Sequence, residues 1–438
     1  MTTTKLLARR RFLPLFVTQL LNAFNDNLYK NAMVLFVVYQ VYSSESAEAT
    51  FSAVATALFI IPFFLLSGLS GQLADMRDKA RIIRIVKASE IAIMIVGGTG
   101  LLLAYHGVLD HTLAIGLMLL ALAAMGVHST FFGPIKYAIL PQHLHRDEVL
   151  AGTGLVEAGT YIAILAGTIL AGFISAQTAA AAVFVTALIG YVASRQVPPA
   201  PPEEPAEPVD GNIWRSTINV VKGSRHDRQV WLAILAISFF WTIGAVLFIQ
   251  FPPLAKNVLM ASKQVASLFL VIFSIGVALG SVGINHLLKN QVSARFAPYA
   301  VIAMGVFVAG FWYVCTLWPS DGMDGLLDIP AFVAQPLALP LLGALLLIAV
   351  AGGMFVVPLY AFLTTRVPTS QAARTIAANN IVNSAAMTVG SVLAFGLSLA
   401  GMPVVDQLLM SAAMCLISAW LAGLLLQAER AEAEALQA

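Results

Sequence analysis

Long apolar runs separated by short polar stretches follow one another along the whole chain. Twelve of these runs approach or exceed the ~20 residues that an α-helix needs to cross a bilayer core of ~30 Å. Only a few residues around Gln177 separate the fifth run from the sixth. The pattern predicts twelve membrane-spanning helices, over residues 12–41, 51–74, 82–105, 112–140, 152–176, 178–193, 230–254, 265–288, 296–318, 338–365, 375–400 and 404–427.

Composition agrees with a chain whose main solvent is lipid. Hydrophobic residues make up 59% and charged residues 11% of the 438 residues, and the mean hydropathy is +0.86. A soluble domain carries about 25% charged residues. Because so few charges cannot cover a water-facing surface, we expect the twelve runs to lie in a membrane.

The distribution of basic residues predicts an orientation. Threading the runs from a cytoplasmic N-terminus places all but three of the 24 lysines and arginines on the cytoplasmic side. Lys256 and Lys263 fall on the opposite side, and Lys30 lies inside the first run. This asymmetry follows the positive-inside rule and supports the count of twelve independently of hydropathy. Both termini are therefore expected in the cytoplasm.

A stretch rich in proline and glutamate, VPPAPPEEPAEPVDG, occupies residues 197–211 near the middle of the chain. It lacks apolar periodicity and predicts an extended, solvated linker. We therefore expect an N-terminal six-helix bundle over residues 1–194, a cytoplasmic linker over 195–229, and a C-terminal six-helix bundle with a short tail over 230–438.

A weak internal repeat supports two comparable halves, because residues 133–159 resemble residues 357–385. In both copies a proline-containing helix end leads through a short basic loop into a helix with a polar start. Parallel six-helix repeats resemble the major facilitator transporters, an all-α fold with twelve transmembrane helices around a central cavity.

The loop after the second run, GQLADMRDKAR, begins at Gly71 and resembles the cytoplasmic loop signature of the same superfamily. Gly71 permits close approach of helices, and the Asp75 carboxylate can accept hydrogen bonds at a helix N-terminus. Arg77 and Arg81 can pair across a cytoplasmic gate. In the alternative interpretation these charges only set the topology. The corresponding segment after the eighth run lacks the acid, so we expect any charge latch to be asymmetric.

Ionisable residues inside apolar runs are costly in lipid and are therefore candidates for function. Asp26 and Lys30 in the first run are four residues apart and can pair with each other. In the alternative interpretation this pair only holds helices together. Helical spacing places six residues on one face, which we expect to look into the transport cavity: Gln19, Asn22, Asp26, Tyr29, Lys30 and Met33.

Polar residues also occur in later runs. Glu157 begins a second polar face near the cytoplasmic boundary, where either a gate or cap role or contact with the cargo fits its position. Asn379, Asn380 and Asn383 form the corresponding group in the eleventh run, although asparagines also join helices by hydrogen bonds. Lys136 can extend to the interface or face an anionic headgroup.

Motifs of catalysis are missing from the sequence. HGVLD and HLHRD place three residues between His and Asp, not the four of a glycerolipid acyltransferase motif. DGMDGLLD lacks the Ala-Arg of lipid phosphatidyltransferases, and no phosphate-binding glycine loop occurs. His128 fits a hydrogen-bonded packing residue better than a proton relay. We expect no catalytic residue, no metal, no cofactor and no nucleic-acid partner.

Five segments from both halves carry a more specific resemblance: FLPLFVTQLLNAFNDNLYKNAMV, GPIKYAILPQ, LVEAGTYIAILAGTILAG, VPLYAFLTTR and RTIAANNIVN. They are similar to the bacterial lysophospholipid transporters of the major facilitator superfamily, with FNDN and AANN as the most specific parts. The resemblance implies movement of lysophosphatidylethanolamine and lysophosphatidylglycerol from the outer to the inner leaflet of the bacterial inner membrane. It also implies a separate acyltransferase/acyl-carrier-protein synthetase that re-acylates them on the cytoplasmic side.

Site residues follow from the same resemblance. The intramembrane aspartate of the family corresponds to Asp26, the lysine of GPIKY to Lys136 and the glutamate of VEAG to Glu157. Lys30 or Lys136 can meet the phosphate of a lysophospholipid, and Asp26 can meet a headgroup ammonium or hydroxyl. We expect the chain to act as a monomer among membrane lipids.

Two other functions stay open at this point. A proton-coupled exporter of drugs or small amphipathic metabolites would use Asp26 or Glu157 as its titrating carboxylate, so uncouplers would abolish its transport. A lipid-remodelling enzyme or its non-transporting membrane subunit would show no transport after reconstitution.

Overall fold

The structure is a computed structural model that describes residues 3–41, 45–202, 209–319 and 325–435. Within these residues the regular elements are helices, apart from one isolated bridge between Ala261 and Leu327. The chain divides into two compact units. The first unit comprises Met1–Gly152, Gly159–Gly223 and Thr364–Ile381, and the second comprises Thr153–Ala158, Ser224–Leu363 and Val382–Ala438.

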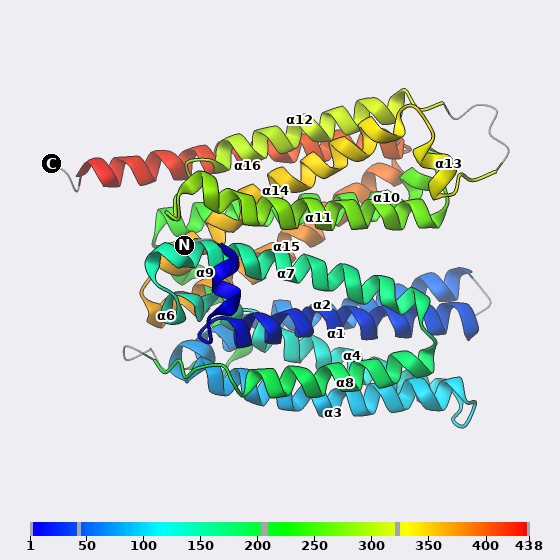
Figure 1. Cartoon of the computed structure of the whole chain (residues 1–438), viewed down its shortest axis with the longest axis horizontal. Coiled ribbons are helices and arrows are strands. Elements are labelled where there is room, and N and C mark those ends of the chain that lie inside the picture. Colours follow the sequence, from blue (N-terminus) through cyan, green and yellow to red (C-terminus); the bar gives the residue numbers. More distant parts are fainter. Residues whose placement is uncertain (1–2, 42–44, 203–208, 320–324, 436–438) are drawn as a thin grey trace. The chain divides into compact units, whose positions relative to one another are not determined.

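Long helices lie side by side within the first unit (Figure 1). α3 packs against α4 and α8, α2 packs against α4, and α1 packs against α8. α3 begins where the Asp78 carboxylate accepts a 2.9 Å hydrogen bond from the backbone N–H of Ala80, as an N-cap residue does. The helices of this unit are α1 (Leu13–Gln40), α2 (Glu45–Met76), α3 (Lys79–Tyr105), α4 (His111–Phe132), α5 (Ile135–Ala138), α6 (Leu140–His143), most of α7 (Arg146–Phe173), α8 (Ala176–Ser194) and α9 (Ile213–Ser224), preceded by the 3-10 turn η1 (Thr3–Ala8).

The second unit is built in the same way, with α16 packed against both α10 and α12. The end of α14, the 3-10 turn η2 (Thr369–Gln371) and the start of α15 belong to the first unit. The helices of the second unit are α10 (Arg228–Asn257), α11 (Lys263–Leu288), α12 (Ala297–Thr316), α13 (Ile329–Val333), most of α14 (Ala338–Thr365), most of α15 (Ala372–Leu399) and α16 (Val404–Ala435).

Eleven helices of the described residues are long and apolar enough to span a bilayer. α1 has the necessary length, with 28 residues, but Asp26, Lys30 and several amide side chains make it more polar. The fifth and sixth predicted runs are separate helices, because the Ser175 hydroxyl accepts from the backbone N–H of Thr178 at 3.1 Å and caps α8. The chain is therefore a multi-pass membrane protein, as its hydropathy predicted.

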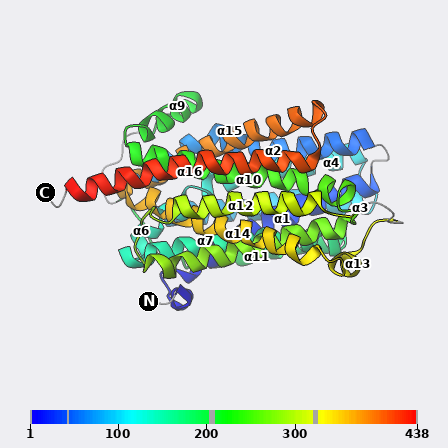
Figure 2. The same cartoon turned by 90° about the horizontal axis from the view of Figure 1, so that it is seen from above.

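The predicted linker contains a helix that the sequence pattern did not indicate. Residues 203–208, at the centre of the Pro/Glu-rich stretch, lie outside the described residues. Beyond them α9 is amphipathic and rests on α2, where Ser216 hydrogen-bonds to Gln72 and the Thr217 backbone lies against Gly68 (Figure 2). A Cβ at Gly68 would lie 2.9 Å from Thr217 Cα, so glycine is what allows this contact.

Candidate functional site

The centre of the candidate site is Asp26, on α1 and only 7% exposed. Its Oδ2 accepts hydrogen bonds from Ser129 Oγ on α4 at 2.5 Å and from Asn22 Nδ2, one turn earlier on α1, at 3.2 Å. Asn22 Nδ2 also lies 3.5 Å from Ser129 Oγ. The polar face of α1 therefore meets α4 at Ser129, and Asp26 is held there by two neutral donors.

A second buried carboxylate, Glu90 on α3, lies in the same unit. Glu90 accepts a 2.7 Å hydrogen bond from Asn25 Nδ2 on α1 and pairs with Lys87, three residues earlier on α3. The Lys87 side chain has no exposure and that of Glu90 has 1%. A Cβ at Gly190 on α8 would lie 2.8 Å from Lys87 Cε, so glycine at this position makes room for the lysine.

His128 on α4 connects the two carboxylates. Its Nε2 lies 3.6 Å from Glu90 Oε2, and its Nδ1 lies 3.4 Å from Ser129 Oγ, the donor to Asp26. With both carboxylates and Lys87 ionised and His128 neutral, this cluster carries one net negative charge. An uncompensated charge is costly in a membrane interior, so the cluster is suited to take up a proton or a cationic group.

A second polar line runs from α1 to α7 and α5. Gln19 Oε1 accepts from Thr160 Oγ1 at 3.0 Å, and Lys136 Nζ lies 3.5 Å from the same hydroxyl. The ammonium of Lys136 also lies over the Tyr137 ring, 4.8 Å from its centroid. The structure thus brings together Gln19, Thr160 and Lys136, which the sequence places in three different helices.

Lys30 and Tyr29 take positions that their spacing did not predict. Lys30 Nζ lies over the Phe59 ring of α2, 5.6 Å from the centroid, and the expected ion pair with Asp26 is not among the ion pairs of the described side chains. Tyr29 is fully buried and donates its hydroxyl to the Met118 carbonyl of α4 at 2.9 Å. Tyr29 therefore fixes α1 to α4.

The later polar residues are buried as well. Glu157 on α7 and Asn379 on α15 have no exposure, and Asn380 is partly buried. Asn383 accepts a 2.7 Å hydrogen bond from Ser238 Oγ on α10. Asn383 therefore joins α15 to α10 within the second unit.

The loop signature holds the start of α15. Asp75 is fully buried, and its two carboxylate oxygens accept from the backbone N–H groups of Ala373 and Arg374, each at 3.0 Å. These donors belong to the first turn of α15, where an anion also meets the positive end of the helix dipole. A Cβ at Gly71 would lie 2.9 Å from the Ala373 carbonyl oxygen, so glycine is required for this approach.

The basic residues of the loop behave differently from the acid. Arg77 and Arg81 are exposed, and neither takes part in an ion pair among the described side chains. The cation beside Asp75 is Arg374, with its Nε 3.7 Å from Oδ2. Arg374 was not predicted, because it lies almost 300 residues away from Asp75 in the sequence.

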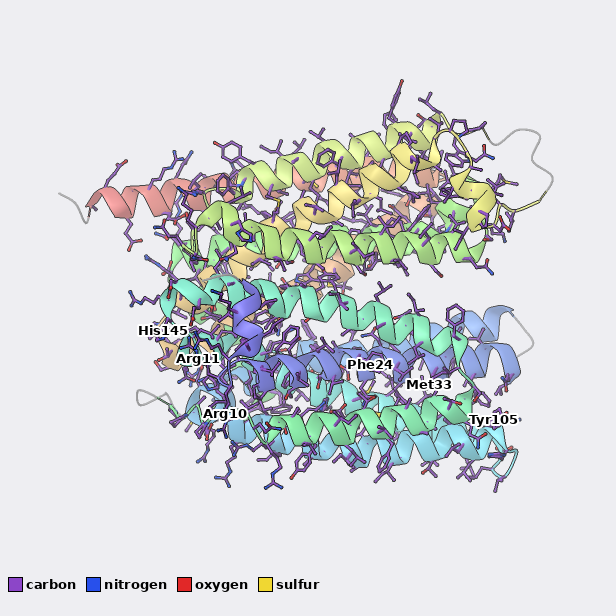
Figure 3. All side chains as sticks on the ribbon, viewed as in Figure 1. Arg10, Arg11, Phe24, Met33, Tyr105 and His145 are labelled. Carbon is purple, nitrogen blue, oxygen red and sulfur yellow. The ribbon has the colours of Figure 1, made fainter. Side chains whose placement is uncertain are left out.

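An ion pair fixes the start of α7 to the residues that precede α1. Arg11 Nη2 donates to both carboxylate oxygens of Glu148, at 2.7 and 2.6 Å, and Glu148 also accepts from the His145 backbone N–H at 3.1 Å. Figure 3 shows Arg11 and His145 at the same end of the unit. This is the end that the charge pattern predicts to be cytoplasmic.

Lys87 and Glu90 are the site residues that sequence reasoning missed. Their spacing of three residues inside an apolar helix was a readable signal for a buried pair. In the sequence, however, Lys87 directly follows the basic residues of the preceding loop, so its charge is also explained by topology. Among the described residues, no group of three or more His, Cys, Asp and Glu side chains could hold a metal ion.

Comparisons with known proteins agree with the resemblance found in the sequence. The lysophospholipid transporter LplT of Serratia proteamaculans is 26% identical over 389 residues, which cover 87% of this chain and 87% of the relative. LplT of Klebsiella pneumoniae subsp. pneumoniae is 25% identical, and the match covers 88% of both chains. The predicted resemblance to bacterial lysophospholipid transporters is therefore confirmed.

Solved structures identify the fold. A bacterial homologue of the iron transporter ferroportin matches with a TM-score of 0.68 at 15% identity, over 95% of this chain and 98% of the other. The human organic anion transporter TETRAN matches with a TM-score of 0.71 at 13% identity, over 94% and 99%. The family profile described as Major Facilitator Superfamily matches residues 15–391. The chain belongs to the Major Facilitator Superfamily and is a membrane transporter rather than an enzyme.

Proposed function

We propose that the chain transports lysophospholipids, moving lysophosphatidylethanolamine and lysophosphatidylglycerol from the outer to the inner leaflet of the bacterial inner membrane. The observation that carries this proposal is the match, along 87% and 88% of the chain, to two relatives that are both named lysophospholipid transporters.

The chemistry of the candidate site supports the same cargo. A lysophospholipid has one acyl chain, a phosphodiester anion and, in the ethanolamine form, an ammonium group. Lys30 and Lys136 are cations placed against aromatic rings, where a phosphate can bind next to apolar surface. Asp26 is a buried carboxylate to which an ammonium or hydroxyl can donate.

In the proposed mechanism, two six-helix halves alternate in access, and the lipid reaches them laterally from the bilayer. The halves are residues 1–194 and 230–438, joined by the linker 195–229. We assign the gate to Gly71, Asp75, Arg77 and Arg81. We assign contact with the lipid, directly or through neighbouring groups, to Asn22, Asp26, Tyr29, Lys30, Lys136, Glu157, Asn379, Asn380 and Asn383.

The proposed direction of transport follows from the resemblance to bacterial lysophospholipid transporters, and the basic residues predict that both termini lie in the cytoplasm. A separate acyltransferase/acyl-carrier-protein synthetase on that side would re-acylate the delivered lipid. Its reaction would keep the inner-leaflet concentration of lysophospholipid low, so transport would run down a gradient.

Reconstitution tests the proposal. Purified protein in liposomes should move labelled lysophosphatidylethanolamine and lysophosphatidylglycerol between leaflets, and it should move the diacyl forms much more slowly. Leaflet exchange no faster than in protein-free liposomes would refute the proposed cargo.

A second candidate, a proton-coupled exporter of small amphipathic molecules, is favoured by one observation. Asp26 and Glu90 are both buried and are connected through His128 and Ser129, which is an arrangement that can hold a transported proton. In the same liposomes, an imposed proton gradient should accelerate transport by such an exporter, and an uncoupler should remove the acceleration. A gradient-independent rate would exclude this candidate.

A further inference from the structure

A cavity of about 610 Å³ lies in the second unit, where the end of α10 approaches the start of α11. Its volume is within the range of ~300–1,000 Å³ that small-molecule sites occupy. The charge pattern predicts that this end of both helices faces outward, opposite to the cytoplasmic termini. Its lining includes Phe248, Phe251, Lys256, Ser262, Ala266 and Leu270.

One wall of the cavity is a fixed aromatic surface. Phe251 is 1% exposed and is packed between Phe248 and Phe269, with ring centroids 5.8 Å away on each side. Phe248 itself is 37% exposed, and Leu270 is partly buried. This wall offers a rigid apolar strip to a hydrocarbon chain.

The other side of the cavity carries a cation and a hydroxyl. Lys256 is exposed in the last turn of α10 and makes no ion pair or hydrogen bond with the described residues. Ser262 precedes α11 without capping it, and its buried Oγ lacks a hydrogen-bond partner in the described part of the chain. The nearby Asp328 carboxylate accepts from the Ala331 backbone N–H at 2.9 Å and so caps α13.

Backbone hydrogen bonds hold the rim of the cavity in place. The Ser262 N–H donates to the Leu327 carbonyl at 2.9 Å, and the Leu327 N–H donates to the Met260 carbonyl at 2.7 Å. Met260 adopts a φ of 46°, a conformation that non-glycine residues rarely take. The ring centroids of Phe332 on α13 and Phe269 on α11 are 6.0 Å apart, and Figures 1 and 2 both place α13 beside this end of α11.

We propose that this cavity is the outward-side binding site for an anionic amphiphile with a single acyl chain. Lys256 and Ser262 hold its phosphate, and Phe248, Phe251 and Leu270 hold the first part of its chain. The single acyl chain and the choice of lysophosphatidylglycerol rest on the proposed function, whereas the anionic group and the apolar chain of the ligand are inferred from the cavity itself. Lysines are usually enriched on the cytoplasmic side of membrane proteins. Binding of an anion would explain a lysine at this position on the outward side.

Photolabelling of the full-length protein tests this site. The protein is placed in nanodiscs of phosphatidylcholine, and the probe is lysophosphatidylglycerol with a diazirine in its acyl chain. Adducts should map by mass spectrometry between residues 248 and 270. Lys256→Gln should raise the half-saturating probe concentration roughly three- to ten-fold, because it removes a charge-assisted contact at an exposed position.

Three further variants separate the contribution of charge from that of fit. Lys256→Arg should retain binding, and Lys289→Gln, which removes an exposed lysine at the other end of α11, should leave it unchanged. Ala266→Trp should fill the cavity and reduce the adducts, with the thermal unfolding midpoint measured to show that the variant folds. A monoacylglycerol probe, which has the acyl chain but no phosphate, should be insensitive to Lys256→Gln.

Three results would overturn the proposal. The adducts could map elsewhere, or they could persist unchanged in both Lys256→Gln and Ala266→Trp. Diacyl phosphatidylglycerol could also compete equally well, which would indicate a non-selective lipid groove. Liposome transport by the unmodified protein is measured separately. Absence of transport with labelling intact refutes the proposed function alone, and transport without labelling in the cavity refutes this site alone.

Discussion

Ser129 on α4 donates a 2.5 Å hydrogen bond to Oδ2 of Asp26 on α1, while Oδ1 of the same carboxylate has no hydrogen-bond partner among the described residues. The buried carboxylate is thus oriented through Oδ2, while Oδ1 is a buried acceptor without a donor in the described structure. A buried acceptor without a donor is unfavourable, so a headgroup ammonium or hydroxyl that reaches Oδ1 gains a strong interaction.

Asp26→Asn should therefore lower lysophosphatidylethanolamine transport about ten- to one-hundred-fold, since hydrogen bonds to charged groups contribute ~1.5–3 kcal/mol. Uptake of labelled lipid into spheroplasts at matched expression measures the effect. Asn27→Ala is the control, because the Asn27 amide donates to the Ala23 carbonyl of its own helix in the described structure. Unchanged uptake by Asp26→Asn would remove Asp26 from the binding site.

The fold was predictable because a lipid environment restricts the secondary structure that a membrane-spanning segment can adopt. Backbone groups must be satisfied within each helix, so apolar length alone indicates most spans, and basic residues set their direction. α1 is the instructive exception, since Asp26 and Lys30 lower its hydropathy although its 28 residues form one helix. The helix α9 was not predicted, because it is short and follows a proline-rich stretch.

The candidate site was only partly predictable. The polar face of α1 could be found from its spacing, but its partners lie on α3 and α4. Both of these helices have low amphipathicity, so their sequences do not indicate which face they turn toward α1. Ser129 and Glu90 could not be matched to Asp26 and Asn25 without the packing. The Asp75 contact was anticipated as a cap, but the helix it caps was not.

Lys87→Met should destabilise the protein by about 3–5 kcal/mol, because it leaves Glu90 as a buried charge without its cation. The double variant Lys87→Met/Glu90→Gln removes both charges and should recover most of this loss. Unfolding of the purified protein in mixed micelles with increasing sodium dodecyl sulfate measures both. If the double variant is no more stable than the single one, the pair is not coupled as the structure indicates.

Asp75→Asn should weaken the attachment of α15 by about 1–3 kcal/mol, because the amide replaces one of the two accepting oxygens with an NH2 group, which cannot accept from the backbone N–H at the first turn. The matched control from the same loop is Arg77→Gln, which changes an exposed residue without an ion pair in the described structure and should shift stability by less than ~0.5 kcal/mol. Hydrogen exchange at Ala373 and Arg374 reports directly on the contact. Faster exchange in Arg77→Gln than in Asp75→Asn would reverse the assignment.

His143, at the end of α6 and between two membrane spans, should make stability depend on pH. Burial lowers the pKa of its imidazole below the usual 6.5. The unfolded chain then binds a proton at His143 before the folded chain does, so stability is full above about pH 6.5 and falls as the pH drops through the window between the two pKa values. His143→Gln should reduce the change of the thermal unfolding midpoint between about pH 7 and pH 5. His106→Gln, at an exposed position after α3, should leave this pH dependence as it is in the wild type. An equal slope in wild type and His143→Gln would show that other groups cause the acid loss.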